Sequence, residues 1–163
     1  MSTTARPAAL VVRAGRGDSR ALLSSRYSVL AASEDTDGAL CVIEMEAPAS
    51  GAPPVHRHEA DAEGFLVLAG SMDVLVEGET TTLQPGDFAW IPAGVAHSFA
   101  PAAEGVRALV LAAPGGFERF VRAAGTPCAG TGLPAPSAPP DPAAMAALAA
   151  EHGITILGPP PGA

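Results

Sequence analysis

Residues 54 to 70 read Pro54-Val-His-Arg-His-Glu-Ala-Asp-Ala-Glu-Gly-Phe-Leu-Val-Leu-Ala-Gly70, and they place two histidines and a glutamate within eight positions. Residues two apart on a strand point to the same face, so a strand ending at His58 directs both His56 and His58 into one space. A short polar turn follows, and Glu63 then opens an apolar run. The residues expected to share its inward face are Phe65, Val67 and Ala69. This stretch therefore predicts most of a metal site.

A fourth candidate ligand lies in the segment Gln84-Pro-Gly-Asp-Phe-Ala-Trp-Ile-Pro-Ala-Gly-Val-Ala-His-Ser-Phe99. The Pro85-Gly86 pair suits a type II turn, because proline fixes φ and glycine supplies a positive φ. A strand should follow this turn, and Pro92-Ala-Gly94 should then break it and return the chain. His97 can begin a new strand with Phe99 on the same face. Three imidazoles and one carboxylate are thus the candidate ligands.

The spacing of these residues resembles the two signature motifs of the cupin family. The matching positions, in chain order, are His56, His58, Glu63, Gly70, Gly86, Pro92, Gly94 and His97. The resemblance covers residues 38 to 122 and is strongest to small single-domain cupins of the quercetin dioxygenase-like group. It implies an all-β fold, the cupin double-stranded β-helix or jelly-roll barrel, with short C-terminal helices.

Two positions depart from the family pattern. Four residues, rather than the usual five, separate Gly51 from His56. Pro101 stands where the second motif often ends in asparagine. Neither departure removes a ligand, but the second one leaves open how the chain leaves the strand that begins at His97.

The chain length of 163 residues fits one domain, which we divide into three parts. Residues 1–26 are expected to form an N-terminal arm with an edge strand at Ala8 to Val12. Residues 27–124 should form the barrel, and residues 125–163 a Pro/Ala-rich linker with a helical tail packed on the barrel. The predicted barrel strands are 27–32, 39–45, 65–69, 72–76, 80–83, 88–91, 97–99 and 106–111.

Two helices are predicted after the barrel. Phe117, Phe120 and Val121 have helical spacing, and this helix could form a lid over the metal site with the preceding pair of glycines as its hinge. The second helix should begin at Asp141-Pro142, an N-cap followed by an N1 proline, and end at Gly153. It is expected to serve packing rather than chemistry.

The composition bears on partners and compartment. The formal net charge is -8 and all nine basic residues are arginine, which argues against a nucleic-acid or anionic-membrane surface. Cys41 and Cys128 lack ligand-like spacing, and the N-terminus lacks the apolar core of a signal peptide, so the cytoplasm is the expected location. Several strands are apolar on both faces, which favours a homodimer that covers part of the outer surface.

Three of the four histidines fall in the two motifs together with Glu63. Burying these groups without partners would cost several kcal/mol, and a divalent metal removes that penalty. Imidazole and carboxylate ligands suit Fe, Mn, Ni, Cu, Co or Zn, so the identity of the one divalent transition metal stays open. Four protein ligands leave one or two coordination positions free, which is typical of catalytic sites.

The resemblance implies a metal-dependent dioxygenase that acts on a small enolic or phenolic substrate with O2. His56, His58, Glu63 and His97 would hold the metal, and Glu63 could also take the hydroxyl proton of the substrate. The predicted apolar wall of the substrate pocket consists of Phe65, Met72 and Phe99. A redox-neutral isomerase or cyclase would use the same residues, and a non-catalytic binding module is the third hypothesis.

Overall fold

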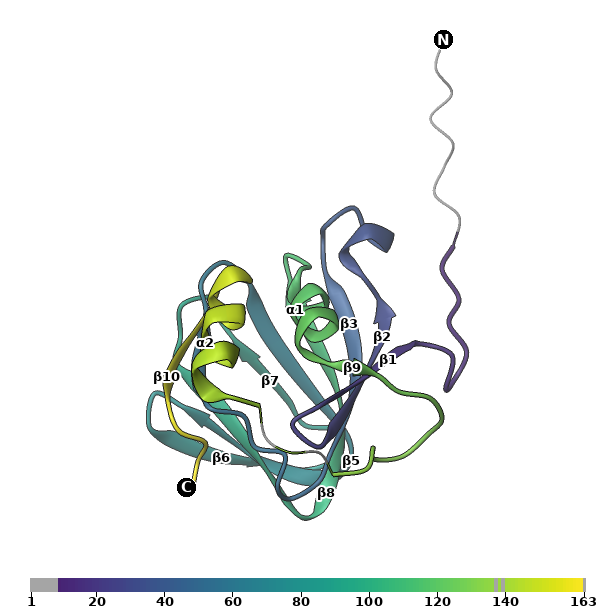
Figure 1. Ribbon diagram of the computed structural model, residues 1–163. Coiled ribbons are helices and arrows are strands. Elements are labelled where there is room, and N and C mark those ends of the chain that lie inside the picture. Colours follow the sequence, from purple (N-terminus) through teal and green to yellow (C-terminus); the bar gives the residue numbers. More distant parts are fainter. Residues whose placement is uncertain (1–8, 137, 139, 163) are drawn as a thin grey trace.

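The structure is a computed structural model and describes residues 9–136, 138 and 140–162. Its strands are β1 (Asp18–Leu22), β2 (Ser25–Ala31), β3 (Cys41–Ala47), β4 (Val55–His58), β5 (Ala62–Val76), β6 (Glu79–Leu83), β7 (Phe88–Ile91), β8 (His97–Ala113), β9 (Thr126–Pro127) and β10 (Ile154–Gly158). The helices are a 3-10 turn at Ser33–Asp35, α1 (Phe117–Ala124) and α2 (Pro142–Glu151). The fold is the expected one, mostly β with two short helices late in the chain (Figure 1).

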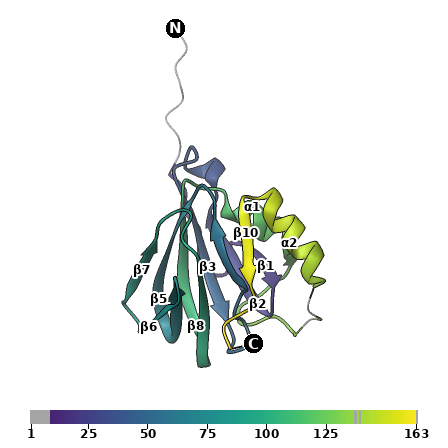
Figure 2. The same cartoon turned by 90° about the vertical axis from the view of Figure 1, so that its left-hand side faces the viewer.

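The sheet is organised around two long strands, β5 and β8. They pair antiparallel from Ala62 opposite Ala113 to Val76 opposite His97. β6 and β7 add to β5, while β4 and β3 add to β8, and β2, β1 and β9 continue outward from β3. Figure 2 shows α1, α2 and β10 on the opposite side of the molecule from β6 and β7.

Each of these two strands was predicted as two short ones, and that prediction was wrong. Gly70 and Gly105 have φ of +69° and +80°, so both strands bend here without ending. A Cβ on Gly70 would lie 2.1 Å from the carbonyl oxygen of Gly105. Glycine therefore lets the two backbones touch at the bend, and the pairing continues on both sides of it. β8 likewise runs unbroken through Pro101, which is buried opposite Met72.

The expectation that Ala69 faces inward was also wrong. Phe65 and Val67 are buried, whereas Ala69 is exposed. The register with β8 shifts between Val67 and Ala69, so Leu68 is an extra residue in a β-bulge. One extra residue reverses the alternation of faces, which turns Ala69 toward solvent.

The N-terminal part of the sheet differs from the prediction in one element. The described part of the expected edge strand, residues 9–12, contains no strand, and residues 1–8 lie outside the described residues. Instead β1, which falls within the expected arm, pairs with β2 and β9. The division of the chain at residues 26 and 124 stays a prediction. β1 and β10 lie outside residues 27–124, yet both pair with strands of the sheet.

Both predicted helices are present. The Asp141 side chain accepts a hydrogen bond from the Ala143 backbone N–H, and Pro142 is the first helical residue of α2. Gly153 has φ of +72° just after the helix, which is the conformation that favours glycine there. Neither this helix nor any other in the described part of the chain is long and apolar enough to cross a membrane.

The core lies between the sheet faces and beneath the helices. Alternate residues of β3 are fully or almost fully buried, namely Cys41, Ile43, Met45 and Ala47. These side chains belong to one hydrophobic core with buried residues of β8 and β5, among them Val110 and Phe65. Phe88 and Trp90 of β7 are 54% and 49% exposed, so this face of the strand points outward.

Candidate metal centre

The four predicted ligands come from three strands, and their side chains converge on one buried point. His56 and His58 lie on β4, and Glu63 lies near the start of β5. His97 is the first residue of β8 and lies directly opposite His56. One ligand atom from each of the four lies within 4.8 Å of all the others. All four side chains are buried, and His56 is the most exposed at 9%. The structure therefore brings the predicted residues together into a cluster that could hold one metal ion.

Each histidine is oriented through its Nδ1 atom. Nδ1 of His56 lies 2.8 Å from the carbonyl oxygen of Pro54, and Nδ1 of His97 lies 2.9 Å from that of Val95. A carbonyl oxygen can only accept, so each Nδ1 carries a proton and donates it. The Nε2 atoms of both rings are then left to face the centre of the cluster, which is the arrangement of metal-binding histidines.

The third histidine uses a carboxylate for the same purpose. His58 Nδ1 donates to Asp61 Oδ2 at 2.7 Å. Its Nε2 atom is enclosed and has no hydrogen-bond partner within the described residues. A buried nitrogen without a partner is costly, and a metal ion at the centre would satisfy it. Sequence reasoning treated Asp61 as a turn residue and missed this role.

The contact between His97 and Glu63 supports the same conclusion. Nε2 of His97 lies 2.7 Å from Glu63 Oε2, while its Nδ1 already donates to a carbonyl. A nitrogen lone pair and a carboxylate oxygen repel each other at this distance, so either a proton or a metal ion has to lie between them. The donor set thus fits a divalent transition metal.

The charges of the cluster depend on one another. Burial alone would raise the pKa of Glu63, but His58 and His97 outweigh it and lower that pKa to about 2. Burial lowers the pKa of His56 to about 4, against the opposing effect of Glu63. Burial also acts to lower the pKa of His58, but Glu63 and Asp61 raise it above its ordinary value. Glu63 is therefore ionised, and His56 neutral, at physiological pH.

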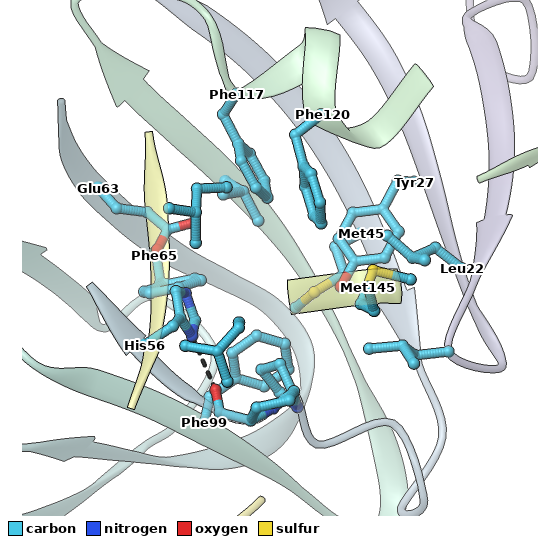
Figure 3. A pocket seen from close by; sticks show the side chains of 16 residues that line it. Leu22, Tyr27, Met45, His56, Glu63, Phe65, Phe99, Phe117, Phe120 and Met145 are labelled. Atoms are coloured by element: carbon cyan, nitrogen blue, oxygen red, sulfur yellow. Dashed lines mark hydrogen bonds between the residues drawn. The ribbon is translucent and has the colours of Figure 1, made fainter. Parts of the chain in front are cut away.

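A mostly apolar pocket adjoins the cluster (Figure 3). Its lining residues are Leu22, Leu23, Tyr27, Met45, Pro53, Pro54, His56, Glu63, Phe65, Phe99, Val110, Phe117, Phe120, Met145, Ile154 and Ile156. Phe65 and Phe99, two of the residues expected in the substrate pocket, line it with their rings edge to face at 5.6 Å. Met72 does not line it, because it is buried further along β5, opposite Leu83 and beyond the bulge at Leu68 and a second register shift between Gly70 and Met72.

The C-terminal tail contributes to the wall of this pocket, and the expectation that its helix serves packing rather than chemistry stays a prediction. Met145 of α2 and Ile154 and Ile156 of β10 are among the lining residues. β10 itself was not predicted, although its alternation of apolar residues was a usable signal. Together with Phe117 and Phe120 of α1, these residues form a cap over the pocket. The Phe117 ring lies 5.3 Å from that of His58.

Comparison with known proteins agrees with this geometry. Residues 43–113 match the family model described as "Cupin domain". The chain is 32% identical over 120 residues to quercetin 2,3-dioxygenase of Bacillus subtilis, an alignment that includes 74% of this chain and only 36% of that protein's length.

Two solved structures have the same fold. The polyketide cyclase RemF from Streptomyces resistomycificus is 25% identical, with a TM-score of 0.54 over 63% of this chain and 78% of that one. A predicted oxalate decarboxylase from Thermotoga maritima is 19% identical, with a TM-score of 0.59 over 64% of this chain and 98% of that one. From these matches and the observed fold we conclude that the chain belongs to the cupin superfamily, with its cupin domain at residues 43–113.

Proposed function

We propose that the protein is a metal-dependent dioxygenase that acts on a small enolic or phenolic substrate. The observation that carries the proposal is the convergence of three histidine Nε2 atoms and one carboxylate at the end of an apolar pocket. The similarity to quercetin 2,3-dioxygenase supports the choice of reaction and substrate class. A divalent transition metal bound by His56, His58, Glu63 and His97 would supply a Lewis acid with free positions for the substrate oxygen and O2.

The residues of the chain would prepare the substrate. Glu63 is ionised at neutral pH because its pKa is lowered to about 2, so it can accept the hydroxyl proton of an enol or phenol. A carboxylate with such a low pKa is a weak base, so the proton transfer would depend on the metal lowering the pKa of the bound hydroxyl. Phe65, Phe99 and Phe117 surround this position with apolar surface and keep water from the reacting atoms.

A redox-neutral cyclase or isomerase is the second candidate. The resemblance to the polyketide cyclase RemF favours it, since that structure is 25% identical and covers 63% of this chain. The same four ligands would act in this case, with the metal as a Lewis acid and Glu63 or a water molecule as the base.

The use of O2 separates the two reactions. The metal-loaded protein would be mixed anaerobically with a panel of flavonols and β-diketones, and O2 uptake would be followed with an electrode after air is admitted. A dioxygenase gives a spectral change without O2 and turnover only with it. Turnover that proceeds equally without O2 would overturn the dioxygenase and leave the cyclase. The His97→Ala protein is the matched control, because it removes one ligand from the same pocket.

We also propose one divalent metal per chain. Elemental analysis of the purified protein should find close to one equivalent, and the His56→Ala and His97→Ala proteins should lose it. Full retention of metal by both variants would show that the ion lies elsewhere.

The outer face of the sheet supports the proposal of a homodimer. Phe88 and Trp90 stack at 6.4 Å on the exposed side of β7, and a Cβ on Gly64 would lie 3.0 Å from the Trp90 ring. Such a flat, exposed aromatic surface is typical of a contact site. Sedimentation should detect a dimer that Trp90→Ser weakens. The two free cysteines, Cys41 and Cys128, support the further proposal of a reducing compartment, the cytoplasm.

Opening of the cap remains a proposal. The pocket leaves a cavity volume of about 60 Å³, enough for a few water molecules, so a larger substrate requires the cap to move. α1 is fixed by Glu118, whose buried carboxylate accepts hydrogen bonds from Ser33 N–H and Oγ–H. This contact opposes a lid movement of α1. α2 buries only Ala149 fully, so we propose that it moves first, which hydrogen exchange of the two helices would test.

A further inference from the structure

The strand that faces the metal cluster from across the pocket carries the one tyrosine of the chain. Tyr27 lies on β2 opposite Met45 of β3, is 6% exposed, and lines the pocket. In Figure 3, His56 and Glu63 lie on one side of the pocket, and Tyr27 and Leu22 on the other. Tyr27, His56 and Glu63 are the only polar side chains among the described residues that line the pocket.

The Tyr27 hydroxyl makes no hydrogen bond to any residue of the described part of the chain. The fully enclosed polar atoms without a partner are Ser25 Oγ, His58 Nε2 and Glu118 Oε2, and Tyr27 Oη is not one of them. The hydroxyl therefore reaches the open space of the pocket. Its neighbours in the lining, Met45 and Met145, offer only thioether sulfur, which is a weak acceptor. The hydroxyl is therefore free to donate a hydrogen bond to an acceptor on a ligand.

The distance between the two polar ends follows from the register of the sheet. Glu63 lies opposite Ala112 of β8, which defines one row of paired residues across the sheet. Tyr27 lies opposite Met45 of β3, and Met45 lies opposite Ala108 of β8, which defines a second row. These two rows are four residues apart, which is roughly 13 Å along the strand at a rise of about 3.3 Å per residue. Tyr27 and Glu63 therefore mark two separate places in the lining of the pocket, on its opposite sides (Figure 3).

The walls between the two ends select for shape. Phe65, Phe99, Phe117 and Phe120 present aromatic rings, and Met45 and Met145 present polarisable thioethers. Such surfaces favour flat aromatic ligands. Burial, with a smaller effect of the Glu63 charge, raises the pKa of Tyr27. The hydroxyl thus keeps its proton at neutral pH and acts as a donor.

We propose that Tyr27 is the second polar anchor of the pocket, and that it donates a hydrogen bond to an acceptor oxygen at the far end of a flat aromatic substrate. The enol or phenol at the other end of that substrate lies at the metal cluster. Tyr27 is thus a specificity-determining residue, which distinguishes aromatic molecules with two oxygen functions at opposite ends from those with one. The inference rests on the proposed function only in that the same pocket receives the substrate.

The test compares two ligands that differ in the far acceptor alone. The probes are 3-hydroxychromone, which has one enol and carbonyl pair, and its methoxy derivatives on the opposite ring. Their dissociation constants would be measured by calorimetry on the metal-loaded protein under anaerobic conditions, so that binding is separated from turnover. A single neutral hydrogen bond should make at least one methoxy derivative bind roughly three- to tenfold more tightly than the parent compound.

Tyr27→Phe should abolish this preference, so that the methoxy derivatives bind no more tightly than the parent compound. Phe120→Leu is the matched control, because it alters the wall without removing a polar group, and it should weaken both ligands alike. The wild-type protein gives a second readout: with fluorotyrosine in place of its one tyrosine, a single fluorine signal should shift with the methoxy ligand and not with the parent.

Three results would overturn the inference: equal binding of the two ligands by the wild-type protein, an unchanged preference in Tyr27→Phe, or the binding of neither compound. A protein that shows the preference but consumes no O2 would keep the Tyr27 anchor and lose the dioxygenase proposal. Failure of one proposal is thereby distinguished from failure of the other.

Discussion

Ile154 lies directly opposite His58 in the antiparallel pairing of β10 with β4, and Ile156 lies opposite His56. β4 pairs with β8 at a single position, His56 opposite His97. The last strand of the chain therefore supplies most of the backbone support for the two ligands on β4. A part of the chain outside the matched family region thus helps to position the metal site.

Removal of β10 should weaken metal binding. A chain that ends after Gly153 loses the partner of β4, so we expect the metal affinity to fall at least tenfold, or about 1.4 kcal/mol, together with the melting temperature. Calorimetric titration with a divalent metal measures the first effect. A chain that ends after Pro160 keeps β10 and serves as the control; equal affinity of the two shortened proteins would contradict this role.

Asp61→Asn should weaken metal binding without unfolding the protein. The Asp61 carboxylate accepts a hydrogen bond from the His58 Nδ1–H, with 2.7 Å between Nδ1 and Oδ2. This bond holds the ring with Nε2 toward the cluster. Loss of such a partner typically lowers metal affinity about 10- to 100-fold. Asp37→Asn is the matched control, since Asp37 is exposed and has φ of +52°, which asparagine adopts readily. The prediction fails if both variants bind metal like the wild-type protein.

Chelation should destabilise the wild-type protein and not its ligand variants. A metal binds the folded state, so its removal should lower the free energy of unfolding by about 3 kcal/mol if free metal had been about 100-fold above its dissociation constant. Melting curves with and without a chelator measure the change. His97→Ala should melt at the same temperature in both conditions, and an unchanged wild-type curve after verified metal removal would refute the site.

Metal binding should release a proton near neutral pH. The pKa of His58 is raised above its ordinary value, so its ring is protonated before metal binds and has to lose that proton. His56, with a pKa lowered to about 4, is already neutral and contributes no such proton. Affinity should therefore fall as pH falls through the raised pKa of His58. Calorimetry in buffers of different ionisation enthalpy counts the protons; zero released at pH 6.5 would contradict the assignment.

The raised pKa of His58 also affects the stability of the protein after its metal is removed, and this stability falls rather than rises with increasing pH. A raised histidine pKa stabilises the folded state below the pKa of the unfolded chain, about 6.5, and this contribution disappears as pH rises through the raised value. The metal-stripped protein should lose this part of its stability as pH rises from about 6.5 through the raised pKa of His58, which melting curves at a series of pH values would measure. The metal-loaded protein should show no such loss.

Glu63→Gln should separate metal binding from proton transfer. The amide oxygen can still ligate weakly, so part of the metal should remain, whereas the rate should fall roughly 10²- to 10⁴-fold if Glu63 is the general base. Turnover per bound metal is the measurement. Glu59→Gln, a change of an exposed acid in the turn between β4 and β5, should behave like the wild-type protein. Near-normal turnover of metal-replete Glu63→Gln would reduce Glu63 to a ligand.

The amino-acid sequence alone determined the four candidate ligands and most of the elements that carry them. His56 and His58 are two apart on a strand, so local geometry places them on one face. Gly86 and Gly94, with φ of +94° and +81°, form the turns that deliver His97, and Asp141 caps α2. Each of these features depends on residues a few positions apart, where backbone sterics and hydrogen bonding act within the chain.

Only the tertiary structure decided which other residues surround the site. Tyr27 and Met145 are separated by more than a hundred positions yet line the same pocket, and Ile154 supports His58 from the opposite end of the chain. The bulge at Leu68 turned Ala69 outward, and the bends at Gly70 and Gly105 carried Met72 away from the pocket. Such pairings depend on contacts between distant strands and on single-residue shifts of register, and neither leaves a trace in local periodicity.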